Sequence, residues 1–419
     1  MTPLPTHAEY DVAVIGGGPG GAALTTLLAR QGHRCVLFEQ ARFPIKHVGE
    51  SLVPQTYDFL ERLGVLPQLR ALAFPAKHCV RFVSPDGQAS IPFQFAENLA
   101  GERAQTWQVE RSQFDCLLLN HARANGVEVQ EQTAVAQVLF EGGQAVGVQA
   151  VSPHGEAMTI RTRVVVDASG RACLLGRQLG VWAPLQDLRK AAIWTHYRGA
   201  PAPVNGSGHE TTIFRTAGGG WFWHVPQPDQ IVSVGLVASP DDLFANSDDI
   251  EAAFNREFAR CAGLRTRLTG ASRFGPLRGL RHLAYLNRQT CGAGWVMIGD
   301  ARAFLDPIYS SGIYLALASA ELAAGSIHEA LRTGDVSGPA LGVFEPALTQ
   351  GLDVLRRLIH AFYDPQFSFP EFLRQFPDQR AALVDCLIGD VLKDLSGFTE
   401  ALAKMTPPPA PLGELPRAA

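Results

Sequence analysis

Three glycines near the start of the chain could hold a phosphate group. Gly16, Gly18 and Gly21 are spaced as G-x-G-x-x-G, between the apolar run Val12 to Ile15 and a segment with helical character at 22–30. The first glycine permits a tight turn, the second lets a diphosphate approach the backbone, and the third allows a helix to pack closely on a strand. Free N–H groups at the start of such a helix attract the diphosphate. The spacing therefore predicts a dinucleotide site.

An acidic residue follows at the distance that this chemistry requires. Glu39 ends a second predicted strand, 34–38, about 20 residues beyond the glycines, where a carboxylate accepts hydrogen bonds from ribose hydroxyls. FAD and NAD use the same motif, so this stretch alone leaves the cofactor open.

Three later stretches favour FAD. WQVERSQFDCLLLN (107–120) resembles the segment in which flavoproteins of the glutathione reductase type place an arginine beside the flavin, here Arg111. VVVDASG (164–170) and WVMIGDARAFLDP (295–307) are predicted strands that end in tight turns. The ending at Asp300 resembles the flavoprotein motif whose aspartate holds the ribityl chain, although an aspartate there is also typical of a helix N-cap.

These elements predict an α/β fold with a discontinuous, Rossmann-like FAD-binding domain of the glutathione reductase type. Its expected segments are 5–75, 105–180 and 286–335. Residues 78–95 and 190–240 show alternating strand patterns, and 76–104 and 181–285 are expected to form an inserted, mostly antiparallel β-sheet substrate domain.

The last part of the chain is predicted to be helical. A helix at 313–332 is expected beneath the flavin, followed by a C-terminal helical region, 336–405, with breaks at prolines. The breaks are predicted at Pro365, Pro370 and Pro377. The proline-rich tail, 406–419, is predicted to be disordered.

Two tryptophans stand out in the substrate domain. Trp221 and Trp223 lie two residues apart in a predicted strand, and 231–238 is expected to be the strand that returns beside it. Side chains alternate along a strand, so both indoles are predicted to project from one face of the sheet. Taken alone, the pair is equally consistent with a buried aromatic cluster.

Composition excludes several classes of protein. The 419 residues carry a formal net charge of −4 and no basic block, which argues against a nucleic-acid partner. The seven cysteines form no CxxC pair and no Cys/His cluster, so we expect no metal site and no disulfide framework. Isolated thiols favour a reducing cytoplasm. No signal peptide and no membrane-spanning run are expected.

Four stretches together resemble the flavin-dependent halogenases, and the resemblance runs from Tyr10 to about Met405. The stretches are RFPIKHVGESLVP (42–54), FPAKHCVRF (74–82), WFWHVP (221–226) and LDPIYSSGIYLA (305–316). They resemble, in turn, a loop near the flavin, the segment with the active-site lysine, the W-x-W-x-I-P motif, and the segment where halide and flavin meet. Val225 stands where the family has isoleucine.

The resemblance implies an enzyme that uses FADH₂, O₂ and chloride or bromide to make hypohalous acid. Lys77 would be the catalytic residue, either by hydrogen bonding from its ammonium or as an N-haloamine, which needs a neutral amine. By residue type alone, this lysine would be a surface residue. Trp221 and Trp223 would separate the flavin from the substrate.

The resemblance also implies the ligand-binding residues. The halide would be bound by the backbone N–H groups of Ser310, Ser311 and Gly312. The alternative is that this turn only caps the following helix and contacts the flavin. The implied FAD-binding residues are Gly16, Gly18, Gly21, Ala22, Glu39, Ser51, Arg111, Val135, Asp300, Pro307, Gly312 and Ile313.

The chain departs from the family pattern at two positions. Tryptophan-specific halogenases carry a glutamate where this chain has Tyr309, which argues against free tryptophan and favours a phenol or pyrrole, often tethered to a carrier protein. Arg302 stands where the family has a small residue, and it is expected to point to solvent or to a flavin phosphate. Glu50 is interpreted as holding its loop, with a catalytic role as the alternative.

Three other functions share part of this pattern. An FAD-dependent aromatic hydroxylase or a reductase of the geranylgeranyl type would keep the glycines, Arg111 and Asp300 without the full set of tryptophans, lysine and serines. A non-catalytic flavoprotein in a biosynthetic complex is the third. A hydroxylase would oxidise NADPH itself, whereas a halogenase of this type takes reduced flavin from a separate NAD(P)H-dependent flavin reductase.

Overall fold

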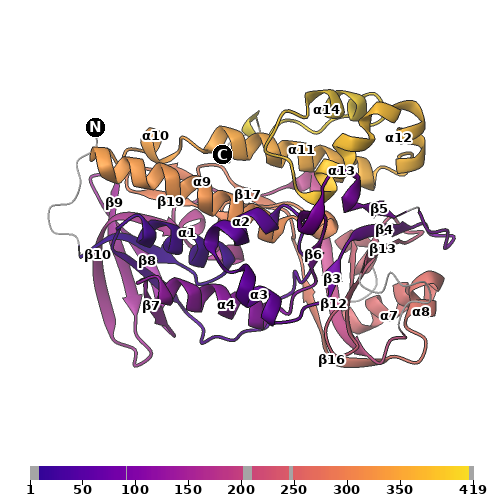
Figure 1. The fold of residues 1–419 in the computed structure, drawn as a ribbon, viewed down its shortest axis with the longest axis horizontal. Coiled ribbons are helices and arrows are strands. Elements are labelled where there is room, and N and C mark those ends of the chain that lie inside the picture. The colour runs from indigo at the N-terminus through magenta and orange to yellow at the C-terminus, as the bar shows by residue number, and fades with distance from the viewer. Residues whose placement is uncertain (1–8, 91, 202–209, 245–248, 415–419) are drawn as a thin grey trace.

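The computed structural model describes residues 9–90, 92–201, 210–244 and 249–414 (Figure 1). A mostly parallel sheet forms its first layer, in the order β18-β19-β10-β1-β2-β7. The hairpin β8–β9 extends it, because β9 pairs antiparallel with both β10 and β8. Its strands are β1 (Tyr10–Ile15), β2 (Cys35–Glu39), β7 (Glu128–Glu131), β8 (Ala134–Glu141), β9 (Gln144–Val151), β10 (Ala157–Asp167), β18 (Cys291–Gly292) and β19 (Trp295–Met297).

Both faces of this sheet are buried, which is typical of parallel strands. Val12 and Val14 pack on one side, in the same apolar core as residues of α1 (Pro19–Arg30), α4 (Arg111–Ala124) and α9 (Gly312–Thr333). Ala13 and Ile15 pack on the other side, against β8, β9 and α5 (Leu174–Gln178). This alternation explains why the sequence shows an uninterrupted apolar run at β1.

The predicted Rossmann-like order of strand, glycine-rich turn, helix, strand and acid is confirmed. Helix α1 begins at Pro19, three residues before the expected start, because proline is favoured in the first turn, where its missing N–H costs nothing. The predicted strand at 34–38 is present as β2, and the residues from Arg111 onward form helix α4.

A second sheet stands beside the first, in the order β16-β12-β15-β14-β13-β4-β5. Its neighbours pair antiparallel, except β13 and β4, which are parallel. Its strands are β4 (Cys79–Val83), β5 (Phe93–Gln94), β12 (Ala191–Arg198), β13 (Thr211–Arg215), β14 (Trp221–Pro226), β15 (Ile231–Ala238) and β16 (Ser272–Leu280). This is the predicted, mostly antiparallel substrate sheet.

Trp221 and Trp223 do project from one face of this sheet, as predicted. They belong to the main apolar core, shared with the FAD-binding layer and the C-terminal helices. Phe222, between them, packs on the opposite face with residues of α7 (Ile250–Arg260) and α8 (Ala262–Arg267).

Shorter elements connect the two sheets. Strands β3 (Ala76–Lys77) and β6 (Thr106–Trp107) pair with each other, and a small sheet runs in the order β11-β17-β20. The remaining elements before α9 are α2 (Thr56–Leu63), α3 (Leu66–Ala71), β11 (Trp182–Pro184), α6 (Pro240–Leu243), β17 (Tyr285–Asn287), β20 (Ala303–Phe304) and the 3₁₀ turn η6 (Pro307–Tyr309).

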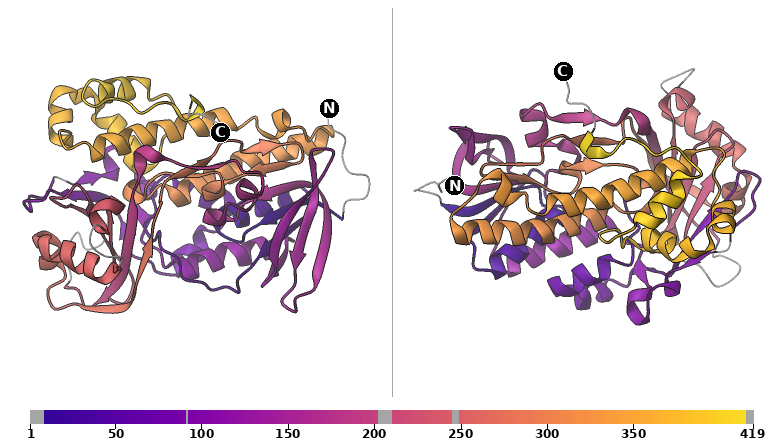
Figure 2. Two further views of the ribbon diagram at one scale, coloured as in Figure 1. Left: turned by 180° about the vertical axis from the view of Figure 1, so that it is seen from behind. Right: turned by 90° about the horizontal axis from the view of Figure 1, so that it is seen from above.

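Helices cover the end of the substrate sheet, on the opposite end of the molecule from the β8–β9 hairpin (Figure 2). They are α11 (Glu345–Tyr363), α12 (Phe369–Gln375), α13 (Arg380–Ile388) and α14 (Ser396–Ala403). The short helix α10 (Gly338–Leu341) instead packs against α9, β18 and β19, near the hairpin end (Figure 1). Pro365 lies between α11 and α12, as expected for a break. Pro370 instead lies in the first turn of α12, and Pro377 opens a 3₁₀ turn, where proline is tolerated.

The predicted disorder of the tail is wrong for residues 406–414. Thr406 is buried, and Leu412 donates its backbone N–H to Asp353 of α11 at 3.0 Å. The guanidinium of Arg356 donates to the backbone oxygen of Ala410. Prolines prevent a helix here but do not prevent an extended segment from docking on α11. Residues 415–419 lie outside the described part.

Candidate active site

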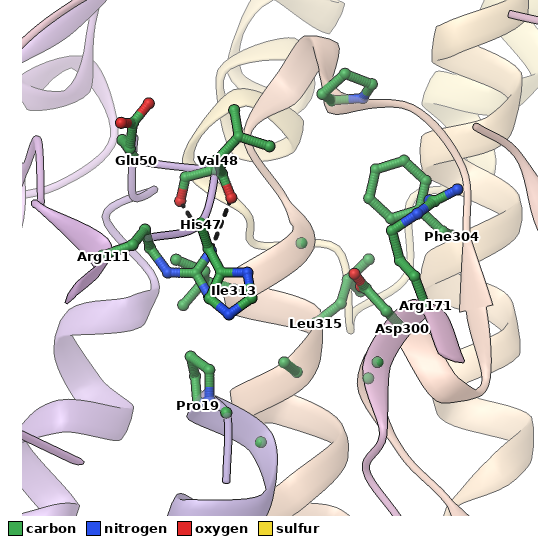
Figure 3. Close-up of a pocket in the computed structure, with 18 of the residues that line it drawn as sticks. Pro19, His47, Val48, Glu50, Arg111, Arg171, Asp300, Phe304, Ile313 and Leu315 are labelled. Carbon is green, nitrogen blue, oxygen red and sulfur yellow. Dashed lines mark hydrogen bonds between the residues drawn. The ribbon is translucent and has the colours of Figure 1, made fainter. Parts of the chain in front are cut away.

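A cavity of about 740 Å³ opens where the glycine-rich turn, the loop at 39–51, the substrate sheet and the start of α9 meet (Figure 3). It brings together most of the residues that the sequence analysis selected. Those lining it are Gly16, Gly18, Glu39, Ser51, Arg111, Trp221, Trp223, Asp300, Pro307, Ser310, Ser311, Gly312 and Ile313.

The three motif glycines meet three different constraints. A Cβ at Gly16 would lie 2.4 Å from the backbone oxygen of Ala168, and Gly16 also has a positive φ of 107°. A Cβ at Gly21 would lie 2.0 Å from the backbone oxygen of Gly16, so this glycine permits the packing of α1 on β1. A Cβ at Gly18 would meet nothing within 4 Å. That open space, at the N-terminus of α1, fits a diphosphate.

Two charged side chains are fixed at the cavity wall by the backbone. Glu39 accepts hydrogen bonds from the N–H groups of Gly17 and Ala41, both at 2.8 Å. Arg111 forms a bidentate ion pair with Asp115 and donates to the backbone oxygen of Val48 at 3.0 Å, which holds the loop near the cavity (Figure 3). Both side chains are therefore held in place without a ligand, as a preformed site requires.

Asp300 faces the cavity with an uncompensated carboxylate. Burial raises its pKa to about 6, and the charges of Arg171 and Arg111 oppose that rise only in part. No hydrogen bond to this carboxylate comes from the described residues. A ligand hydroxyl that donates to it would supply the missing partner.

The turn before α9 differs from the expected nest in one detail. Ser310 has a positive φ of 55°, and its N–H donates to the backbone oxygen of Pro307 at 3.1 Å, so it is not free for an anion. Gly312 and Ile313, in the first turn of α9, have N–H groups that a helix leaves without an intrahelical acceptor. The anion-binding potential therefore lies at residues 311–313.

Lys77 does not line the cavity. Its side chain is 2% exposed, and its Nζ donates to Ser51 Oγ and to the backbone oxygen of Leu52, both at 2.9 Å. Nζ lies 5.5 Å from the centroid of the Phe95 ring. Burial lowers the pKa of the lysine to about 7. The prediction of a surface residue from its type is thus wrong, and one hydroxyl separates the amine from the cavity.

The two tryptophans are held by different partners. Their ring centroids lie 6.0 Å apart, with the planes inclined by 53°. Trp223 donates its indole N–H to Ser233 at 3.1 Å, and Trp221 donates its own to Tyr363 at 2.8 Å. The Tyr363 hydroxyl in turn donates to Asp306 at 2.8 Å. Hydrogen bonds thus orient both rings at the cavity wall.

Several residues of this site were missed by the sequence analysis. Thr211 lines the cavity, lies 2.9 Å from Ser51 through its hydroxyl, and accepts a hydrogen bond from Gln108. Tyr363 and Asp306 complete the support of Trp221. Gln108 and Asp306 fall within motif stretches quoted above, so the sequence did indicate that they lie near the site. Thr211 and Tyr363 carried no such signal, because each meets a partner more than 140 residues away along the chain: Ser51 for Thr211 and Trp221 for Tyr363.

Four other predicted residues lie away from the cavity lining or have unexpected partners. Val135 pairs with Ala150 in the β8–β9 hairpin and does not line the cavity. Gly21 and Ala22 lie behind the glycine-rich turn, buried in α1. The prediction for Arg302 is wrong. Its guanidinium pairs with Glu345 of α11 at 2.7 Å, so the side chain points neither to solvent nor to the cavity.

The two remaining positions singled out above are structural in this fold. Glu50 accepts from His196 of β12 at 2.8 Å, which ties its loop to the substrate sheet and agrees with the interpretation that it holds the loop. Tyr309 is buried, and its hydroxyl donates to the backbone oxygen of Leu358 at 3.2 Å.

Three further findings concern metal sites, cysteines and membrane spans in the described part of the chain. Within the described residues, no group of three or more His, Cys, Asp or Glu side chains could hold a metal ion. All seven cysteines are free thiols. No helix of the described part combines the length and the apolar character that crossing a membrane requires.

The fold and the cavity define a two-layer flavoprotein with a dinucleotide site beside a tryptophan-bearing sheet. Comparisons with known proteins identify the class. The model of the tryptophan halogenase family matches residues 11–102 and 84–368. The chain is 32% identical over 405 residues to a 1H-pyrrole-2-carbonyl-[peptidyl-carrier protein] chlorinase of Pseudomonas fluorescens, covering 91% of this chain and 90% of the relative.

Two further matches extend the comparison. A tryptophan 2-halogenase of Chondromyces crocatus is 32% identical over 384 residues, covering 86% of this chain and 69% of the relative. The solved structure of the flavin-dependent brominase Bmp2 superposes with a TM-score of 0.84 at 28% identity, covering 94% of this chain and 97% of Bmp2.

The chain belongs to the tryptophan halogenase family of flavin-dependent halogenases. It is therefore an enzyme that uses FAD and a halide, and the resemblance drawn from its motifs is confirmed. This membership decides against the alternative hydroxylase, reductase and non-catalytic flavoprotein.

Proposed function

We propose that this enzyme uses FADH₂, O₂ and chloride or bromide to halogenate a phenol or pyrrole ring that a carrier protein delivers. The observation that carries the proposal is the relation between Lys77 and the cavity. The amine is shielded from the cavity that fits the flavin, yet a single hydroxyl, that of Ser51, joins the two. A small oxidant reaches such an amine, whereas a bulky substrate does not approach the flavin.

The residues at the cavity wall fit FAD and divide its contacts. Gly18 and the N-terminus of α1 would hold the diphosphate, Glu39 the ribose, and Asp300 the ribityl hydroxyls. Arg111, Pro307 and Ile313 would contact the flavin ring. When bound and reduced, FAD supplies the electrons with which O₂ and a halide ion give hypohalous acid and water.

The other residues would control the halide and the oxidant. The N–H groups of Gly312 and Ile313 would bind the halide, since a buried anion needs donors. Lys77 would receive the hypohalous acid and direct its halogen to the substrate. Trp221 and Trp223 would keep the substrate ring away from the flavin, so that it is halogenated rather than hydroxylated.

The substrate class is inferred from one position and one relative. Tyr309 replaces the glutamate of tryptophan-specific halogenases, and its hydroxyl is engaged with Leu358, so no carboxylate is available there for an indole N–H. The similar chlorinase of Pseudomonas fluorescens acts on a pyrrole that is bound to a carrier protein. Both support a carrier-bound ring over free tryptophan.

Two cellular aspects belong to the same proposal. A separate NAD(P)H-dependent flavin reductase would supply FADH₂, as the family's chemistry requires. Seven unpaired thiols support a reducing, cytoplasmic environment.

The proposal is tested with purified protein, FAD, NADH, a separate flavin reductase, O₂ and bromide. Pyrrole-2-carboxyl and 4-hydroxybenzoyl groups are supplied on a carrier protein, and the free acids and tryptophan serve as comparison substrates. Mass spectrometry is expected to detect bromination of a carrier-bound ring only with the reductase present. K77A is expected to abolish bromination while flavin oxidation continues. Bromination of free tryptophan alone would overturn the substrate assignment, and product formation by K77A would overturn the role of the lysine.

A further inference from the structure

The hydroxyl of Ser51 lies between Lys77 and the cavity, and the hydroxyl of Thr211 lies next to it. Ser51 and Thr211 both line the cavity, and their oxygens lie 2.9 Å apart. Ser51 Oγ is also the acceptor for Lys77 Nζ at 2.9 Å. Thr211 Oγ1 accepts from the side-chain amide of Gln108 at 2.9 Å, which leaves the Thr211 O–H free to rotate toward the cavity or toward Ser51.

The backbone around this pair holds it firmly. Lys77 lies in β3 and pairs with Thr106 of β6, and Ser51 forms an isolated bridge with Gln108. Leu52 donates its N–H to Trp107 at 3.1 Å, and its carbonyl is the second acceptor for Nζ. The distance between the amine and the hydroxyl is therefore set by three crossing segments rather than by one mobile side chain.

Among the described residues, the hydrogen-bond partners of Lys77 Nζ offer no other route for a proton. Its Nζ faces two oxygens and the Phe95 ring, and its side chain has almost no contact with solvent. Cys79 is the titratable group whose charge acts on the lysine, and its buried thiol contacts Glu210 at 3.7 Å. A carbonyl oxygen and an aromatic ring cannot pass a proton on, whereas a hydroxyl both accepts and donates.

We propose that Ser51, supported by Thr211, is the proton exit of Lys77 into the cavity. This inference rests on the proposed role of Lys77. Ser51 is catalytic because it touches the reacting nitrogen, and Thr211 is a positioning residue that acts through Ser51. The relay runs from the Lys77 ammonium to Ser51, from the Ser51 hydroxyl to Thr211, and from Thr211 to water in the cavity.

The relay supplies the neutral amine that halogen transfer needs. The nitrogen lone pair attacks the halogen of hypohalous acid, so that the N–halogen bond forms and the O–halogen bond breaks with its electron pair leaving on oxygen. The hydroxide that leaves takes the second proton from nitrogen and becomes water. The balance is R–NH₂ + HOX → R–NHX + H₂O, with hypohalous acid as the only oxidant.

The first experiment reads the protonation of Lys77 directly in the FAD-bound protein. The chain contains five lysines, Lys46, Lys77, Lys190, Lys393 and Lys404, so lysine labelled with ¹³C at Cε gives a spectrum in which K77M identifies the Lys77 signal. S51A removes an acceptor of the ammonium, so the titration midpoint is expected to fall by about one pH unit. T212V is the matched control, since Thr212 neighbours Thr211 on β13 but points to the opposite face. An unchanged midpoint in S51A would overturn the contact.

The second experiment follows the halogen. Flavin oxidation is recorded by absorbance, product by mass spectrometry, and escaped hypohalous acid with a cyclic 1,3-diketone trap, all as functions of pH. In S51A, the product formed per flavin oxidised is expected to fall at least tenfold, while trapped oxidant rises. T211V is expected to show a smaller loss, T212V none, and S51T a partial recovery. A larger solvent deuterium isotope effect on product formation in T211V would reflect the impaired relay.

The outcomes separate this inference from the proposed function. K77A could lose product while product formation by S51A keeps the pH profile of the wild-type enzyme. That result would support the role of Lys77 and overturn the role of Ser51 as its proton exit. Full activity in K77A would overturn the proposed function, whatever S51A shows. An S51A enzyme whose product loss is the same at every pH, with an unchanged isotope effect in T211V, would assign a merely structural role to the hydroxyls.

Discussion

The indole nitrogen of Trp221 lies 2.8 Å from the hydroxyl oxygen of Tyr363, although the two residues are 142 positions apart. The Tyr363 hydroxyl donates a hydrogen bond to Asp306, and burial raises the pKa of this aspartate to about 6. The ammonium of Lys190 lies 3.9 Å from the centre of the Tyr363 ring and offsets part of the carboxylate's charge. A tryptophan of the cavity wall is thus anchored to α11 through a buried polar chain.

Replacing Tyr363 by phenylalanine is expected to destabilise the protein by about 1–3 kcal/mol. The substitution keeps the ring but leaves the Trp221 N–H and the Asp306 carboxylate without their partner, and buried polar groups left unpaired cost this much. Urea unfolding followed by tryptophan fluorescence measures the loss. Y197F, a buried tyrosine packed on the opposite face of the sheet, is the control. Equal losses in both variants would contradict the anchoring role.

Two glycine substitutions are expected to separate folding from cofactor binding. G18A places a Cβ in open space, so the melting temperature without FAD should change little, while FAD affinity falls at least tenfold because the methyl group occupies the diphosphate position. G21A places its Cβ 2.0 Å from the Gly16 oxygen and should lower the melting temperature strongly. Thermal unfolding and FAD fluorescence titrations measure both quantities. A lower melting temperature in G18A without a loss of FAD affinity would show that the diphosphate does not lie at Gly18.

Asp300 is expected to oppose stability at neutral pH. Its pKa is raised by burial from 3.8 to about 6, so the folded protein binds the proton more tightly than the unfolded chain, and the free energy of unfolding decreases as the pH rises from 3.8 to 6. D300N carries no charge. The FAD-free variant should therefore be more stable than wild type above pH 6, with an advantage that disappears near pH 4.

The same substitution is expected to weaken FAD binding by about tenfold, because a neutral amide replaces a charged acceptor for the ribityl hydroxyls. Unfolding at several pH values and FAD titration at pH 7 test the two effects. A pH-independent stability difference would refute the assignment of the titrating group.

Lys77 is expected to show the opposite pH dependence. Its pKa is lowered by burial from 10.5 to about 7, so between these values the unfolded chain holds a proton that the folded protein has lost, and stability increases with pH. K77M removes the buried charge. The variant should exceed wild type in free energy of unfolding most at or below pH 7, and the difference should shrink toward pH 10.5. Urea unfolding at pH 6, 8 and 10 measures the difference, and K404M, at the exposed residue that follows α14, is the control.

Much of the fold was predictable from local patterns. The glycine spacing, the apolar run of β1 and the acid at the end of β2 depend on neighbours within about 30 residues, and each follows from short-range geometry. The shared face of Trp221 and Trp223 follows from the two-residue period of a strand. The resemblance of four motifs to flavin-dependent halogenases then assigned the class of enzyme.

The sequence alone determined which residue types are available for chemistry and which of them share a face, because the period of a helix or strand is a local property. Only the tertiary structure decided that Lys77 is buried and joined to Ser51, that Arg302 pairs with Glu345, and that residues 406–414 dock on α11. Each of these outcomes depends on segments that are distant in the chain. Desolvation and hydrogen bonding act on the final packing, which no local pattern specifies.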